Sequence, residues 1–428
     1  MRHVSYLFLL SLLLPGQLFA QSILRGQVVD QASGQFLAFA QLRLLQKGEG
    51  IITNEEGRFA LKLPLGTETD TLLISYVGYQ TASLPLSSLD DDRELRIPLF
   101  SAGVTLDSVW IRPVTAEELL RQALAAVEDN YRFEPLNGEA FYRELIRENG
   151  KYVEISEAVL SVYKTPSGLE PGPGSQVSLV KGRHRTTPQK LQNLIVSSGA
   201  GHPQNLMAMQ VNCRPKSYHF LETKNFKLYE YQIEGTTLYQ DREVWIIGFD
   251  QAKKLRKKLY QGKIYLDVGT MAFALIEYDI SERGKKYRMS QVMSVFERGK
   301  LALAAALGYK FRLTGDQGRM AFLYEQGHWY PSHVSQRGQA YTTAPERETA
   351  AEVYFDWAAQ LIYTDWAFGR QARAIAPTER MHADQHMKDL VGEYDASFWE
   401  SYQHLELSSE LQEVFNQPLP QESTQIED

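Results

Sequence analysis

A histidine and a glutamate three positions apart, His219 and Glu222, have the spacing of two ligands in a zinc site. A catalytic zinc ion needs a third protein ligand and an open position for water or substrate. His328 and His333 are available, but no spacing selects either of them. Because the chain has nine histidines and 52 acidic residues, one such pair arises nearly by chance. The apolar residues between the pair are typical of a buried strand, so we predict no metal ion here.

Other catalytic patterns are weaker. His382 and His386 lie four apart in an expected helix and would share one face. No glutamate follows His382, as the metalloprotease motif requires, so an exposed polar helix face explains the pair. The nucleophile elbow of serine hydrolases, the phosphate-binding loop and the dinucleotide fingerprint are all missing from the sequence. Catalysis by residues distant in sequence stays open, because triads are recognised by geometry. We assign no catalytic, cofactor-binding or metal-ligating residue, and expect no cofactor.

Two basic stretches, residues 181–190 and 253–258, could contact anionic lipid headgroups or lipopolysaccharide. The only apolar residue of the second stretch, Leu255, offers too little surface to insert into a membrane. We therefore interpret both stretches as solvated loops between strands. Aromatic residues are frequent in the C-terminal third and could line a ligand groove, although core packing explains most of them. They are Tyr324, Trp329, Tyr330, Tyr341, Tyr354, Trp357 and Trp366.

The N-terminus predicts where the protein resides. Arg2 and His3 precede an apolar run over residues 4–14, and a break at residues 15–16 leads to a small residue, Ala20. This arrangement predicts a secretory signal peptide that is cleaved after Ala20. No other segment is apolar enough to cross a membrane as a helix. We therefore expect an exported protein that is periplasmic or associated with the outer membrane.

Composition limits the class of fold and of partner. A chain of 428 residues suggests two or three domains. The 23 tyrosines and 19 phenylalanines favour strands over helices. A net charge of −7 argues against a general role in binding nucleic acid, which requires a basic surplus. The single cysteine, Cys213, cannot form an internal disulfide.

Residues 23–100 alternate short apolar strands with turn residues, which predicts a small β-sandwich of five to seven strands. Gly57 and Gly78 are expected to supply turn conformations. Four ordered motifs, at Gly26–Asp30, Gly34–Ala40, Thr53–Phe59 and Ile74–Tyr79, resemble the carboxypeptidase-regulatory-like domain. The resemblance implies a transthyretin-like sandwich of the kind common in Bacteroidota envelope proteins. It implies no peptidase activity, because the related module is the non-catalytic companion of the enzyme.

The remainder of the chain has the pattern of antiparallel hairpins. Residues 262–280 alternate on both sides of Gly269-Thr270 and predict a hairpin with one buried face. A second hairpin is expected to turn at Gly315-Asp316, and a capping box at residues 115–118 opens a helix. Motifs such as Phe141–Glu144 resemble the long C-terminal region of the same two-part envelope proteins. The strands also resemble those of the half-barrel that carries lipoproteins through the periplasm.

These observations predict a mainly β protein: an N-terminal transthyretin-like sandwich followed by a larger antiparallel α+β domain, which could be a curved half-barrel. The predicted divisions are a signal peptide (1–20), the sandwich (21–100), a linker (101–114), the α+β domain (115–376) and a helical and disordered tail (377–428).

The favoured function is that of a non-catalytic, exported envelope protein that binds a partner or an apolar ligand, such as a lipid, a lipid-modified chain or an envelope protein. A glycan ligand and peripheral membrane contact are open. We place the ligand on the concave face of the sheet, closed by the helix that begins at Thr115. The alternative is a periplasmic hydrolase with its site in the second domain. An outer-membrane barrel is disfavoured, because few uniform ten-residue alternating segments are present.

Overall fold

The computed structural model describes residues 22–89, 94–104, 114–131, 134–165, 175–186, 203–208, 218–287, 306, 308, 310–343, 352–368, 370–382, 385, 387–402 and 405–416. The expected signal peptide and the last segment, 417–428, lie outside these ranges, as does most of the expected linker. The fold is mainly β, as predicted. Among the described residues, no helix is both long and apolar enough to cross a membrane.

The described residues between Ile23 and Leu99 form a small sandwich of two sheets, with strand orders β4-β1-β7 and β3-β2-β5-β6. Apolar side chains from both sheets share one core, which confirms the expected transthyretin-like architecture of two packed sheets. Gly57 and Gly78 have φ angles of 69° and 86°, so both supply the turn conformations predicted for them. The strands are β1 (Ile23–Asp30), β2 (Gln41–Leu44), β3 (Gly50–Ile52), β4 (Arg58–Lys62), β5 (Thr71–Ser75), β6 (Ala82–Pro85) and β7 (Leu95–Leu99), with a 3-10 turn at Leu86–Ser88.

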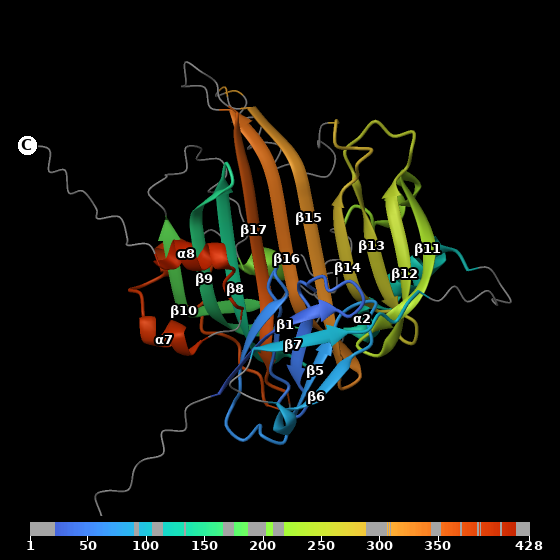
Figure 1. Ribbon diagram of the computed structural model, residues 1–428. Coiled ribbons are helices and arrows are strands. Elements are labelled where there is room, and N and C mark those ends of the chain that lie inside the picture. Colours follow the sequence, from blue (N-terminus) through green and yellow to red (C-terminus); the bar gives the residue numbers. More distant parts are fainter. Residues whose placement is uncertain are drawn as a thin grey trace, which may run out of the picture.

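The larger unit is a single antiparallel sheet of 10 strands in the order β10-β9-β8-β17-β16-β15-β14-β13-β12-β11 (Figure 1). Its first and last strands along the chain, β8 and β17, pair with each other inside the sheet, as the third and fourth strands of the order. The strands are β8 (Leu136–Glu148), β9 (Lys151–Lys164), β10 (Gln176–Thr186), β11 (Tyr229–Tyr239), β12 (Arg242–Gln251), β13 (Tyr260–Asp267), β14 (Phe273–Ile280), β15 (Lys310–Glu325), β16 (His328–Thr343) and β17 (Val353–Trp366).

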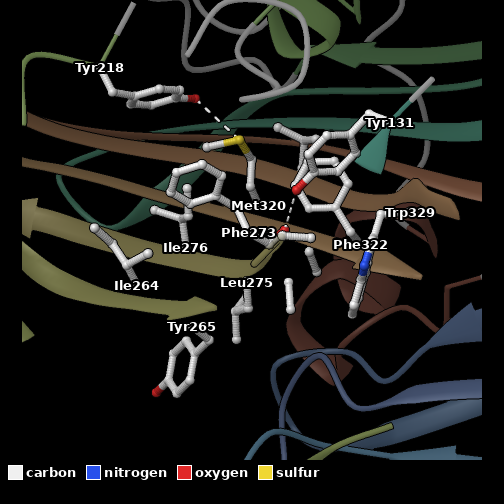
Figure 2. Packing of buried hydrophobic residues seen from close by; sticks show 14 of the residues in the cluster. Tyr131, Tyr218, Ile264, Tyr265, Phe273, Leu275, Ile276, Met320, Phe322 and Trp329 are labelled. Carbon is white, nitrogen blue, oxygen red and sulfur yellow. Dashed lines mark hydrogen bonds between the residues drawn. The ribbon is translucent and has the colours of Figure 1, made fainter. Parts of the chain in front are cut away.

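The predicted hairpin over residues 262–280 is present as β13 and β14, but both of its faces are buried rather than one. Ile264, Tyr265 and Leu266 are consecutive and all lie in the core. Figure 2 shows Tyr265 on the side of the sheet opposite to Tyr218. Consecutive side chains of a strand point to opposite faces, so a covering layer must lie on each side. The alternation of polar residues in this hairpin therefore does not mark a solvent face.

The hairpin expected at Gly315-Asp316 does not form, and β15 instead runs without a turn for 16 residues and pairs along its length with β16. The register shifts between Leu313 and Gly315, which is a bulge rather than a chain reversal. A Cβ atom at Gly315 would come within 2.7 Å of the Gln339 side chain. Glycine is therefore used here for a close cross-strand approach, and the turn interpretation was wrong.

Helices and loops cover one face of the sheet. The capping box predicted for residues 115–118 is present, with Glu118 N donating to Thr115 Oγ1 over 3.2 Å, and it opens α1 (Ala116–Ala125). The short helices α2 (Val127–Asn130) and α4 (Pro203–Ala208) and the 3-10 segment Thr223–Leu228 complete this layer. Tyr131 Oη donates to Phe273 O over 2.7 Å and ties α2 to the sheet. Fully buried aromatic rings fill the space beneath these elements.

The sandwich and the C-terminal helices cover the opposite face. Figure 1 shows the sandwich in front of the sheet, with α7 (Ala396–Ser401) and α8 (Ser409–Asn416) beside β8 and β9. Ile52 of the sandwich shares a core with Ile362 of β17 and with Trp399 of α7. A further short helix, α6 (Met387–Leu390), packs on β10. The sandwich is therefore joined directly to one face of the sheet.

Candidate functional site

The proposed zinc pair makes other contacts. The ring of His219 lies 2.9 Å from Tyr229 Oη through Nδ1, while Glu222 forms a 2.6 Å salt bridge with Lys224. Burial lowers the pKa of His219. His333 is on β16, five strand steps from Tyr229 on β11, or about 24 Å at 4.8 Å per step. The described residues contain no group of three or more His, Cys, Asp or Glu side chains arranged to hold a metal ion.

The other polar stretches are distributed differently from expectation. Residues 181–186 lie in β10, not in a solvated loop, and Lys181 pairs with Asp395 at 2.8 Å. Lys258 donates to Leu313 O over 2.6 Å and is buried. His382 is exposed, while His386 and Cys213 lie outside the described residues. These positions do not converge on one site in the described part of the chain.

A row of polar side chains crosses the sheet instead, on the face that the sandwich covers. Each residue of the row is the register partner of the next. The row starts on β10, at one edge of the sheet, and crosses β9, β8, β17, β16, β15 and β14 to end on β13. Because partners in an antiparallel sheet project to the same side, all of these side chains share one face. In order, the polar row is Arg183, Glu157, Arg143, Gln360, Ser335, Arg319, Glu277 and Lys263.

The C-terminal helices seal one end of this polar row. Glu157 is completely buried and accepts hydrogen bonds from the Nε atoms of Arg143 and Arg183, both at 2.5 Å. Burial alone would raise the pKa of Glu157, but the two guanidinium groups outweigh it and lower the pKa. Arg183 also lies 4.4 Å from the ring centroid of Trp399, and Arg143 donates to Leu405 O over 2.9 Å. This end is closed to a ligand.

The sandwich covers the polar row further along, at Arg319. The ring of Phe39 stacks on His333 at a centroid distance of 5.4 Å and lies 6.0 Å from the Arg319 guanidinium. Tyr76 lies at the same distance from Arg319, which pairs with Glu277. Burial, with a smaller contribution from Arg319, lowers the pKa of His333 to about 3, so this histidine is neutral at physiological pH.

A cavity of about 760 Å³, which we call the junction cavity, lies between the sandwich and the sheet around Phe39 and Arg319. The sandwich contributes one wall, and β13 to β17 contribute the other. Such a volume lies within the usual range of small-ligand pockets, roughly 300–1,000 Å³. The lining residues are Ala38, Phe39, Glu55 and Tyr76 from the sandwich, and Gln261, Gly262, Lys263, Glu277, Tyr278, Asp279, Gln317, Gly318, Arg319, Ser335, Gln336, Arg337, Ala358, Ala359 and Gln360 from the sheet.

This cavity differs from the expected site. Helix α1 does cover a face of the sheet, but the space below it is packed with buried rings such as Tyr131 and Phe322, as Figure 2 shows. The junction cavity lies on the other face, and sequence reasoning missed its residues. A pattern was present: Glu277 and Asp279, and likewise Gln317 and Arg319, are polar residues two apart in strands. That spacing places each pair on one face.

Comparisons with known proteins identify one region of the chain. The family model of the CarboxypepD_reg-like domain matches residues 24–111. No curated protein matches the chain. Among solved structures, a LolA superfamily protein from Nitrosomonas europaea is 12% identical, with a TM-score of 0.21, over 62% of this chain and 97% of that chain. A DUF1329 family protein from Desulfovibrio piger is 11% identical, with a TM-score of 0.21, over 60% of this chain and 96% of its own. The sandwich is thus a CarboxypepD_reg-like domain.

Proposed function

We propose that this protein is a non-catalytic binding protein of the cell envelope, and that its ligand occupies the junction cavity. The observation that carries the proposal is the construction of this cavity from two units, with Phe39, Tyr76 and Glu55 reaching in from the sandwich. Ligand sites in proteins form preferentially at such junctions between domains. The N-terminal signal-peptide pattern supports an exported location.

Direct contacts hold the two walls in place without any ligand. Gln41 Nε2 donates to Ser332 Oγ over 2.7 Å, and Arg43 pairs with Glu325 at 2.7 Å. The backbone N–H of Gly78 also donates to Leu238 O over 2.8 Å. A site that is formed in advance requires less ordering when the ligand binds, which favours affinity. The binding role therefore needs no large movement of the sandwich.

The lining residues favour a ligand that has both apolar and polar surface. Phe39, Tyr76 and Ala358 offer apolar contact, whereas Lys263 and Asp279 offer charge. A purely hydrocarbon ligand would bury charged side chains without replacing the water around them, which is costly. Among the ligand classes that the sequence leaves open, one with hydrogen-bonding groups fits this cavity better than a bare acyl chain.

One contact favours the alternative, a hydrolase. Ser156 Oγ lies 2.9 Å from Nδ1 of His184, and both side chains are on the face of the sheet opposite to the polar row. In a catalytic triad the histidine stands between the nucleophile and the acid. Here Glu144 is the register partner of Ser156, not of His184, and the other His184 nitrogen lies 3.0 Å from Thr186 Oγ1. The order of these groups is wrong for a triad, so we favour binding.

Native mass spectrometry of the mature protein, purified from the cell that produces it, tests the proposal. Ser335 is half-buried and faces the cavity, so Ser335→Trp should fill the space. We expect a co-purifying small molecule on the wild type and at least a tenfold lower occupancy on this variant. Ser83→Trp, on an exposed position of edge strand β6, is the matched control and should keep the ligand.

Two results would count against the proposal. Equal occupancy of Ser335→Trp and wild type would place the molecule outside the junction cavity. A wild-type protein that carries nothing, and that releases nothing on organic or aqueous extraction, would remove the binding role. Thermal melting of each variant shows whether the fold survives, so that a lost ligand is not confused with a lost structure.

A further inference from the structure

The chemistry of the junction cavity allows its ligand to be specified further, provided that the proposed binding role holds. Three glutamines of the lining, Gln261, Gln317 and Gln360, project from the sheet to the face on which the cavity lies, whereas the amide of Gln336 donates to Asp316 on the opposite face. A glutamine amide carries both a donor and an acceptor in one plane. Two adjacent hydroxyl groups of a sugar ring offer the same combination, one donating and one accepting.

Much of this hydrogen-bonding capacity is unused within the described residues. Gln317 donates from Nε2 to Asp279 over 3.0 Å, which leaves its Oε1 without a protein partner. Gln261 accepts a long 3.5 Å bond at Oε1, and its Nε2 has none. Gln360 is 8% exposed, and its Oε1 is also unpartnered. Gln261, Asp279 and Gln317 lie on the adjacent strands β13, β14 and β15, so one ligand can reach all three, whereas Gln360 is on β17, two strands beyond Gln317.

The basic side chains of the lining are already paired with carboxylates, whereas the lining carboxylates Glu55 and Asp279 have no basic partner among the described residues. Lys263 forms a 2.9 Å salt bridge with Glu234, and Arg337 Nε donates to Asp356 over 3.0 Å. Arg319 is paired with Glu277. An anionic ligand would have to break one of these pairs, leaving a carboxylate without its partner, and would also approach the two unpaired carboxylates, and both effects cost free energy. The cavity is therefore suited to a neutral ligand with many hydroxyl groups.

Aromatic rings from the sandwich supply the remaining contact. Phe39 and Tyr76 line the cavity on the side opposite to the glutamines of the sheet. A sugar ring has an apolar C–H face and polar edges, so it can pack on an aromatic ring while its hydroxyl groups meet amides. An acyl chain would use the rings but leave the amides without partners, at a cost for each buried group.

We infer that the ligand of the junction cavity is a neutral saccharide, held by its C–H face against Phe39 and Tyr76 and by its hydroxyl groups on Gln261, Gln317 and Asp279. The sandwich supplies the aromatic wall, and the sheet supplies the hydrogen bonds. Neither unit alone carries both kinds of group at this site.

Two probes test this inference on the full mature chain. The first is the pool of oligosaccharides that mild acid releases from the envelope of the producing cell, and the second is lauric acid. Gln261→Leu removes one amide at similar size, and Gln80→Leu, at an exposed position of the sandwich, is the matched control. We expect retention of a neutral oligosaccharide, weakened about fivefold to tenfold by Gln261→Leu only, as loss of one or two hydrogen bonds predicts.

The outcomes separate this inference from the proposed function. Lauric acid bound by the wild type and lost in Ser335→Trp, with no oligosaccharide retained, would overturn the saccharide while the binding role stands. Retention of an acidic oligosaccharide in preference to a neutral one would also overturn it. If an oligosaccharide binds but Ser335→Trp retains it, the junction cavity is not its site and the inference fails. Thermal melting confirms that Gln261→Leu is folded.

Discussion

The two faces of the 10-stranded sheet are built from the same strands and have opposite character. On one face, rings such as Tyr131, Phe273 and Phe322 are fully buried beneath α1 and α2. On the other face, polar and charged side chains alternate with apolar ones, and a space of about 760 Å³ remains below the sandwich. The packed face supplies most of the stability, and the polar face supplies a site. Because successive side chains of a strand point to opposite faces, the same strands can form a core on one face and line a binding site on the other.

The largest expected effect is on the packed face. Phe322 is completely buried and lies 5.0 Å from the ring of Tyr131, so Phe322→Ala should reduce the free energy of unfolding by about 3–5 kcal/mol. Phe39→Ala, on the polar face, should cost about 1 kcal/mol, which is the worth of an aromatic pair. Urea unfolding of both variants measures the difference. Equal losses would contradict the division of roles between the faces.

A buried ion pair on the polar face should give the next largest effect. Glu157→Gln leaves Arg143 and Arg183 without a carboxylate, which should cost about 3 kcal/mol at pH 7. The folded-state pKa of Glu157 is lowered, so its contribution is present above its unfolded pKa, about 4.3, and is lost as the pH falls further. The gap to wild type should therefore close in acid. The exposed Glu243→Gln is the control, and a gap independent of pH would refute this account.

A carboxylate on the packed face should show the opposite dependence of stability on pH. Burial raises the pKa of Glu144 to about 8, so the folded state holds a proton that the unfolded state releases above about pH 4.3. Stability should fall as the pH rises from about 4.3 to about 8. Glu144→Gln should equal the wild type near pH 4 and be more stable than it at pH 8, by at most about 5 kcal/mol, which is the full linkage value of this shift. Urea unfolding at both values, with exposed Glu128→Gln as control, measures this.

Local features of the fold were predictable because their physical causes are local. The capping box at Thr115 and the turn at Gly57 each depend on a few adjacent residues, and both are present. Gly315 was misread because its reason is a side chain on another strand, Gln339, which no local pattern reveals. Turn residues and close-approach glycines look alike until the pairing is known.

The junction cavity could not be predicted from local sequence patterns for the same reason. Phe39 and Arg319 lie 6.0 Å apart in space but belong to different units of the chain. Their meeting depends on how the sandwich docks, which strand patterns do not encode. The pairs of polar residues two apart in β14 and β15 did indicate one polar face. They did not indicate which element covers that face or how much space it leaves.

The pairing of β8 with β17 has a consequence for biosynthesis. It joins Glu148 to Phe355, residues about 200 positions apart, in the interior of the sheet. A contact between distant residues forms only after a long loop has closed. The loss of chain entropy therefore precedes the stabilisation, and folding is slow. The sheet cannot be completed until its last strand has left the ribosome. The large sheet of a chain with this topology is therefore still incomplete throughout most of its synthesis.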